Sequence, residues 1–163
     1  MLMIRTKVRK SIIPGAGLGL FANQFIPKGT MTWRFGPGFD LIVPKDDLLR
    51  LSEPARQQFL NYCYFDKKTK HFILCSDDER FINHSEKPNI IQGGNDEIEG
   101  IEIAARDIHR GEELFCNYYD FDEDADRKLK KTGIYKYLEY NEVYSCSKKS
   151  SPQIFQTLKE ILR

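Results

Sequence analysis

The segment "RFINHSEKPNI", from Arg80 to Ile90, constrains the fold of this chain more than any other. An apolar side chain lies at or next to each end of the segment. Its eleven residues nevertheless include two carboxamides, an imidazole and a hydroxyl. Polar groups inside a protein need hydrogen-bond partners. Taken alone, the segment therefore predicts a packed loop whose polar side chains are satisfied from elsewhere. These side chains are Asn83, His84, Ser85 and Asn89.

Length and composition indicate one soluble, globular domain. The chain has 163 residues, of which 40% are hydrophobic and 30% charged, and its formal net charge is +1. That balance argues against a general binder of nucleic acid or membranes. The basic residues Arg5, Lys7 and Arg9 alternate with apolar or small ones, which favours one solvated face of a strand over a docking site for an acidic partner.

No apolar run approaches the roughly 20 residues of a membrane helix, and "MLMIRTKVRK" lacks the apolar core of a signal peptide. We therefore expect an intracellular protein, either cytoplasmic or, in a eukaryote or a host cell, nuclear. No metal site is expected, because the histidines are scattered and no cysteine belongs to a CxxC pair. Reduced, mostly buried thiols are expected instead, although the sequence leaves open a Cys–His nucleophilic site. The cysteines are Cys63, Cys75, Cys116 and Cys146.

Short strands dominate the expected secondary structure. Residues 45–63 read as two helical pieces, the second capped by Ser52 with Pro54 in its first turn. The order of charges in 122–131 predicts another helix, and the tail beyond Ser151 is amphipathic. The fold class is therefore a β-rich α+β fold. Strands are expected within 4–8, 30–35, 71–75, 89–92, 98–105, where Ile101 and Ile103 alternate with Glu102, and 111–121.

The glycine-rich segment "GAGLGL", residues 15–20, invites a dinucleotide-binding interpretation. That fingerprint needs a third glycine where Leu20 stands, and a turn at Pro27 follows instead of a long helix. An ordinary turn remains possible. The glycines do allow close approach of the backbone to a ligand.

A third segment, "GEELFCNYYDF" at 111–121, ends in two adjacent tyrosines, and alone it suggests only a core tyrosine. The order of the three segments is more specific. A G-x-G turn, then R-F-x-N-H-S-x-x-P-N, then G-E-E-L-x-x-x-Y resembles the SET-domain protein lysine methyltransferases. The resemblance covers about residues 4–122, and the middle motif matches at every defining position.

The resemblance implies a fold of small, mostly antiparallel sheets with a C-terminal pseudoknot, a rare threading of the chain. It implies a SET domain at 4–122 and a helical tail at 123–163 that covers the lysine channel. It also implies S-adenosylmethionine as cofactor and no metal. The residues expected at the cofactor are Gly17, Leu18, Gly19, Leu20, Phe81, Asn83, His84 and Tyr118.

Tyr118 stands at the family's catalytic position, where its hydroxyl would orient methyl donor and amine. Cys116, Tyr135 and Tyr137 are expected to line the substrate channel, which the small Cys116 would leave open on its side. Pro88 and Asn89 are expected to fix the loop shape. The expected partner is a protein substrate that carries a lysine, without direct contact to nucleic acid or membrane; the oligomeric state is left open.

The chain departs from the family pattern in three places. Arg34 stands near a usual tyrosine, Asn117 replaces an acidic residue before Tyr118, and no cysteine-rich zinc segment follows the domain. Two alternatives therefore stay open. One is a catalytically silent SET-fold module that binds protein or cofactor, and the other is an enzyme whose methyl acceptor is not a protein lysine.

Overall fold

The computed structural model describes residues 1–93 and 100–130. Short strands outnumber helices among them, which confirms the expected β-rich α+β class. The elements in chain order are β1 (Thr6–Lys10), β2 (Leu18–Ala22), β3 (Met31–Arg34), β4 (Leu41–Val43), α1 (Lys45–Leu49), α2 (Glu53–Tyr62), β5 (Tyr64–Phe65), β6 (Phe72–Leu74), the 3-10 helix η1 (Asp78–Phe81), β7 (Asn83–His84), β8 (Ile90–Gly93), β9 (Ile101–Ala104), β10 (Phe115–Cys116), α3 (Tyr118–Phe121) and α4 (Ala125–Lys130).

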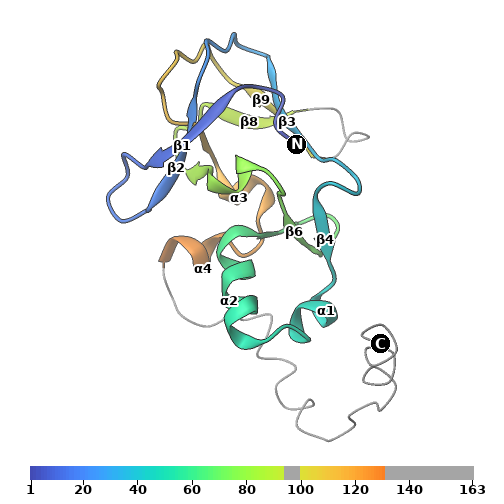
Figure 1. Cartoon of the computed structure of the whole chain (residues 1–163). Coiled ribbons are helices and arrows are strands. Elements are labelled where there is room, and N and C mark those ends of the chain that lie inside the picture. The colour runs from blue at the N-terminus through green and yellow to red at the C-terminus, as the bar shows by residue number, and fades with distance from the viewer. Residues whose placement is uncertain (94–99, 131–163) are drawn as a thin grey trace, which may run out of the picture. The chain divides into compact units, whose positions relative to one another are not determined.

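The described strands form four small sheets, with the strand orders β1-β2, β10-β7, β3-β9-β8 and β4-β6-β5. Every pairing is antiparallel except that of β7 with β10. Small, mostly antiparallel sheets are therefore confirmed. In Figure 1 the β1-β2 and β3-β9-β8 sheets lie at one end, α1, α2 and β4 lie at the other, and α3 lies between them.

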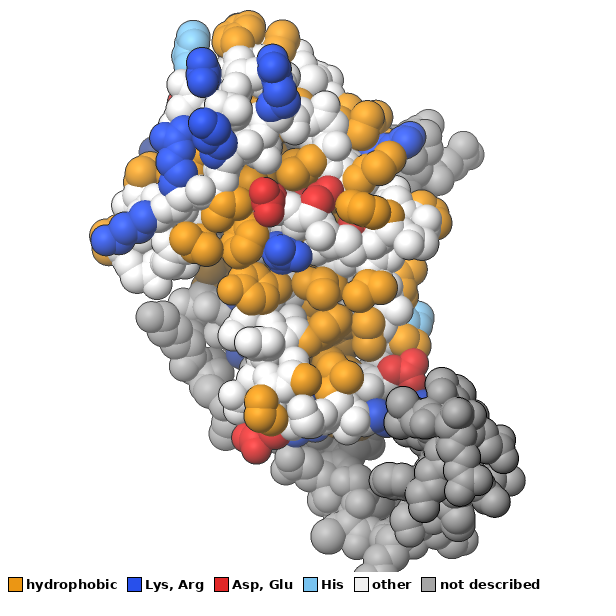
Figure 2. All heavy atoms as spheres, viewed as in Figure 1, with side chains coloured by type: hydrophobic (Ala, Val, Ile, Leu, Met, Phe, Trp, Pro, Cys, Tyr) orange, Lys and Arg blue, Asp and Glu red, His pale blue; other side chains and the backbone are white. Residues whose placement is uncertain are grey.

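The β1-β2 hairpin has one solvated face and one face toward the core. Lys7 and Arg9 are exposed on β1, whereas Leu20 and Ala22 on β2 are fully buried. The solvated strand face expected from the alternating basic residues is thus confirmed. Figure 2 shows lysine and arginine side chains gathered over this end of the molecule.

Strand β9 is confirmed, but its buried face is the unexpected one. It lies between β3 and β8, and Glu102 and Ala104 face the interior while Ile101 and Ile103 are only half-buried. An alternating pattern fixes which residues share a face, but it does not fix which face is covered. The consequence is a carboxyl group inside the protein.

Helices α1 and α2 confirm the two pieces expected at 45–63. Ser52 is the N-cap of α2 and Pro54 lies in its first turn, as expected, but the Ser52 hydroxyl does not cap a backbone N–H. The strand expected over 111–121 is wrong at its end. Only Phe115–Cys116 is a strand, because the Asn117 side chain accepts a hydrogen bond from Tyr119 N at 3.2 Å and starts the helical turn α3.

The parallel pairing of β7 with β10 joins segments about thirty residues apart in the chain. Asn83 is opposite Phe115, and His84 is opposite Cys116. Asn89 lies next to the pair and is 3% exposed. Its Nδ2 donates to Glu113 O at 2.9 Å, and its Oδ1 accepts from Phe115 N at 2.8 Å. Asn89 thus fixes the loop through these two side-chain hydrogen bonds, which we call the Asn89 clamp. The threading of the chain as a pseudoknot stays a prediction.

Several predictions fall outside the described residues. They concern the tail helix and the channel residues Tyr135 and Tyr137, together with Cys146 and most of the turn after Gly93. Within 1–93 and 100–130, none of the helices has the length and apolar content needed to cross a membrane.

The Asn89 clamp makes a testable contribution to stability. Asn89→Ala removes both side-chain bonds and leaves two buried backbone groups, Glu113 O and Phe115 N, without these partners. Each unpaired buried group costs about 1–3 kcal/mol, so we expect the free energy of unfolding to fall by at least ~2 kcal/mol. Urea unfolding of parent and variant measures it.

Gln57→Ala is the matched control, because Gln57 is exposed on α2 and bonds only Glu53 nearby. Its unfolding free energy should stay within about 0.5 kcal/mol of the parent. An Asn89→Ala variant that is as stable as this control would show that the clamp is not needed.

Candidate active site

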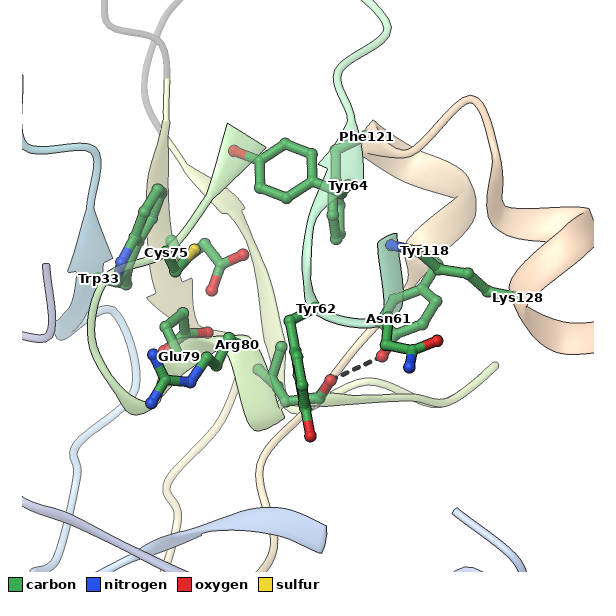
Figure 3. A pocket seen from close by; sticks show the side chains of 12 residues that line it. Trp33, Asn61, Tyr62, Tyr64, Cys75, Glu79, Arg80, Tyr118, Phe121 and Lys128 are labelled. Carbon is green, nitrogen blue, oxygen red and sulfur yellow. Dashed lines mark hydrogen bonds between the residues drawn. The ribbon is translucent and has the colours of Figure 1, made fainter. Parts of the chain in front are cut away.

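The β7-β10 pairing brings Tyr118 to the Asn83–His84 dipeptide. Tyr118 N donates to His84 Nδ1 at 3.2 Å, and the Tyr118 hydroxyl donates to Ile82 O at 2.7 Å, the dashed line in Figure 3. The two rings lie 5.5 Å apart between centroids. Residues from two of the three sequence motifs are therefore joined by direct contacts.

Burial fixes the protonation states of this pair. It raises the pKa of the Tyr118 hydroxyl far above the ordinary value, so the phenol stays protonated at physiological pH. It also lowers the pKa of the His84 imidazole, against the raising effect of Glu86 and Asp120. Since His84 Nδ1 accepts a hydrogen bond, the neutral imidazole is the form that fits.

A buried carboxylate, Glu113, connects the glycine-rich segment to Asn83. Asn83 Nδ2 donates to Glu113 Oε1 at 3.0 Å and to Leu18 O at 2.9 Å. Ser11 Oγ donates to the same carboxylate at 2.7 Å. A Cβ on Gly19 would lie 2.0 Å from Glu113 Oε1, so this close approach requires glycine. All three motifs thus meet around one side chain.

Beside Tyr118 lies a pocket, shown in Figure 3. Tyr118 and Lys128 lie on one side of it, Trp33 and Glu79 on the other. Its volume of about 60 Å³ exceeds the roughly 10–15 Å³ that one water needs, so it has room for several waters or a narrow chain. The residues that line it are Trp33, Asn61, Tyr62, Tyr64, Cys75, Glu79, Arg80, Ile82, Glu102, Tyr118, Phe121 and Lys128.

The glycine-rich residues expected at the cofactor lie next to Asn83. Gly17 has a positive φ of 79° and is exposed, and Leu18 is 48% exposed. Leu20 is fully buried, and its carbonyl already accepts from Leu114 N at 2.7 Å. Any contact of Leu20 with a ligand would therefore be indirect.

Of the other expected site residues, Phe81 is half-buried and packs edge-on against Tyr62, with ring centroids 5.6 Å apart. Cys116 is 2% exposed within the hydrophobic core and is not among the pocket-lining residues. The structure thus brings Asn83, His84 and Tyr118 together and places the Cys116 thiol behind them.

The described cysteines are poor nucleophiles. Cys63, Cys75 and Cys116 are free and buried. Burial raises the pKa of the Cys63 thiol to about 12 and raises the pKa of the other two as well. Since the thiolate is the reactive form, these residues do not support the Cys–His alternative. Within the described ranges no group of three metal-ligating side chains is found.

Sequence reasoning missed several residues of this site. Tyr62 is the last residue of α2 and Tyr64 begins β5, and nothing in their spacing separates them from core tyrosines. In the sequence, Glu113 was noted only as one residue of the G-E-E-L motif, without a role of its own. Glu79 lies in the run "SDDERF", which reads as a solvated charge cluster, yet it is 5% exposed.

Comparison with solved structures supports the fold. A humanized mutant of the Chaetomium thermophilum Polycomb Repressive Complex 2 bound to the inhibitor GSK126 shares 26% identity over 76% of this chain and 16% of that chain, at a TM-score of 0.55. ctPRC2 in an autoinhibited conformation bound to S-adenosylmethionine shares 22% identity over 85% of this chain and 17% of that chain, at a TM-score of 0.55. A candidate histone methyltransferase of Plasmodium falciparum shares 17% identity over 72% of this chain and 95% of that chain, at a TM-score of 0.50.

The chain therefore spans about one sixth of the Polycomb chains that it resembles. The comparison with curated proteins found no match. The family model for the SET domain matches residues 17–119, which is more than half of the chain and includes all three motifs. On this match, and with its fold and motif contacts in agreement, the chain belongs to the SET domain family.

Proposed function

We propose that this protein transfers a methyl group from S-adenosylmethionine to the side chain of a protein lysine. The observation that carries the proposal is the contact of Tyr118 with His84 and Ile82 at one side of a narrow pocket. Membership of the SET domain family supports it. So does the similar ctPRC2, which was solved with S-adenosylmethionine bound.

The residues around Asn83 fit the amino-acid end of the cofactor. Both bonds that the Asn83 amide donates are to the protein, but its Oδ1 has no donor among the described residues. That oxygen would accept from the cofactor's ammonium group. The backbone of Gly17, Leu18 and Gly19 would lie along the other side, where the glycines keep it accessible.

The cofactor supplies a methyl group on a positively charged sulfur. Around such a methyl a site should present oxygen atoms, and Tyr118 Oη and Ile82 O are 2.7 Å apart at this place. Because burial keeps the Tyr118 phenol protonated, we assign it the orientation of the reacting groups and not the removal of a proton. Positioning of this kind supplies up to about 7–11 kcal/mol in favourable cases.

The pocket would hold the lysine side chain. Tyr62, Tyr64 and Ile82 give it apolar walls next to Tyr118. Such walls disfavour the charged ammonium, since desolvation lowers the pKa of a lysine. The target amine would thus be helped toward the neutral form that attacks the methyl group. We retain the proposal that the tail beyond residue 122, including Tyr135 and Tyr137, closes the channel.

The rival is a SET-fold module without catalysis. It would keep the cofactor contacts and have no need of a tyrosine hydroxyl at Ile82 O. Radiolabelled methyl transfer onto mixed proteins, read after confirmation of cofactor binding by calorimetry, separates the two. Binding without transfer would favour the module, and labelled small amines in place of protein would favour a non-protein acceptor.

Asn83→Ala should weaken cofactor binding. The change removes the Oδ1 acceptor and leaves Glu113 and Leu18 O without their amide donor. A loss of about 1–3 kcal/mol corresponds to roughly 5–150-fold in Kd. Calorimetric titration of the folded variant with S-adenosylmethionine measures it. Asn23→Ala, directly after β2, is the control, and equal affinities for the two variants would remove Asn83 from the site.

Tyr118→Phe should slow transfer and spare cofactor binding. It deletes only the hydroxyl, so the ring packing against His84 and Phe121 stays. We expect at least about a tenfold lower rate, or ~1.4 kcal/mol of transition-state stabilisation. Single-turnover transfer of labelled methyl measures it.

Tyr119→Phe is the matched control for this change. Its hydroxyl is exposed and bonds Asp126 at 3.0 Å, away from the pocket. It should transfer methyl at the parental rate. If the two variants are equally active, Tyr118 has no catalytic hydroxyl.

A further inference from the structure

The pocket beside Tyr118 contains two acidic side chains inside the protein. Glu79 on η1 is 5% exposed and Glu102 on β9 is 6% exposed, and both line the pocket. Glu79 Oε1 and Glu102 Oε2 are each buried without a donor among the described residues. The two carboxyl groups line the same pocket and lie close enough for each to influence the pKa of the other.

Burial and the nearby Glu102 carboxyl both raise the pKa of Glu79. Two carboxylates in contact inside a protein do not both ionise, because like charges repel and burial disfavours each charge. The pair therefore holds one proton and about one negative charge. Gln92 Nε2 donates to Glu102 Oε1 at 3.1 Å and supports the charge on that side.

A second unpartnered group lies in the same pocket wall. Trp33 is 2% exposed, and its Nε1 is buried with no acceptor in the described part of the chain. A buried indole N–H usually has a partner. Figure 3 places Trp33 and Glu79 on the same side of the pocket, opposite Tyr118. This side is thus polar and incompletely satisfied, as expected of a wall that faces water or a ligand.

We propose that the Glu79–Glu102 pair accepts the proton that the target amine loses before methyl transfer. This inference rests on the proposed function. A protonated lysine entering the pocket meets a carboxyl pair with one negative charge. One N–H bond breaks, and the proton passes through pocket water to the pair, which then holds two protons. The neutral amine uses its freed electron pair to form the bond to the methyl carbon as the S–CH₃ bond breaks, and the pair returns its extra proton to solvent.

The groups around the pair suit this role. Burial raises the pKa of both carboxyls, and for Glu79 the charges of Glu102 and then Asp77 raise it further. The ammonium of Met1 lowers it for both. The carboxyls are thus stronger bases than ordinary glutamates.

The other ionisable groups of the pocket do not compete for the proton. Cys75 and Tyr64 are neutral because burial raises the pKa of each. Lys128 is paired with Asp122 at 2.7 Å. The Arg80 guanidinium, which has donors and no acceptor, lies over the Phe81 ring, 5.1 Å from its centroid. The pair is therefore the proton acceptor that the pocket offers.

The first experiment is a pH profile of methyl transfer to mixed histones by the parent, Glu102→Gln and Glu79→Gln. Without the acceptor, the lysine ammonium must lose its proton to the solution, where its pKa is about 10.4. General-base effects are typically about 10²–10⁴-fold, and because one carboxyl of the pair remains, we expect each variant to be at least about tenfold slower at pH 7. Its rate should rise steadily toward pH 10, with cofactor affinity unchanged.

Glu53→Gln, on an exposed site at the start of α2, is the control and should keep the parental profile. Melting curves check that each variant folds. If Glu102→Gln does not fold, the profile of Glu79→Gln decides the test. Variants with the parental rate and profile would overturn the inference.

The second experiment does not depend on methyl transfer. The probe is n-butylammonium, which has the four carbons and the cation of a lysine side chain. Adding the probe should shift the carboxyl ¹³C resonances of Glu79 and Glu102 until the shift saturates, and it should leave the resonance of Glu53 unchanged. In the Tyr64→Trp variant, whose larger ring fills the pocket, the probe should cause no shift. No shift at the two carboxyls overturns the inference. A shift in a protein that transfers no methyl retains the cation site and rejects the proposed function.

Discussion

The two-residue parallel pairing of β7 with β10 is the constraint on which the rest of the site depends. So short a ladder supplies few hydrogen bonds, and the surrounding side chains hold it in place. Asn89 bonds the backbone on both sides of Leu114, through Glu113 O and Phe115 N. Ser85 N adds a bond to Cys116 O at 2.9 Å. Only when this junction is closed do Tyr118 and His84 meet.

The junction also divides two kinds of environment. On one side, the Glu113 carboxylate accepts hydrogen bonds from Ser11 and Asn83 and lies against Gly19. On the other side, Tyr62, Tyr64 and Ile82 form an aromatic and aliphatic wall. Tyr118 lies at the boundary and contributes to both. A charged cofactor end and a desolvated amine need such unlike surroundings within one small domain.

Sequence reasoning predicted β1, β3, β6, β8, β9, β10, α1 and α2, which follow from periodicity and turn signals. The family resemblance implied the meeting of the motifs. The strands β2, β4, β5 and β7 were not predicted. Sequence reasoning failed where tertiary packing decides. Nothing local indicates that Glu102 and not Ile103 faces inward on β9, since that depends on which sheet face is covered. Glu79 reads as a surface residue beside Asp77 and Asp78, and its burial follows from the position of η1 against β1 and β2. Cys116 is buried in the core, and its expected place in the substrate channel stays a prediction.

Burial of the thiols gives the protein a reporter of its own conformation. Cys63, Cys75 and Cys116 are 1%, 6% and 2% exposed, and they come from three separate parts of the described chain. A bulky alkylating reagent can reach them only when the structure opens. The rate of modification at each position would therefore report local opening near α2, after β6 and at β10 separately. Mass spectrometry of the modified peptides would rank these three regions by the free energy of their opening, without any engineered label.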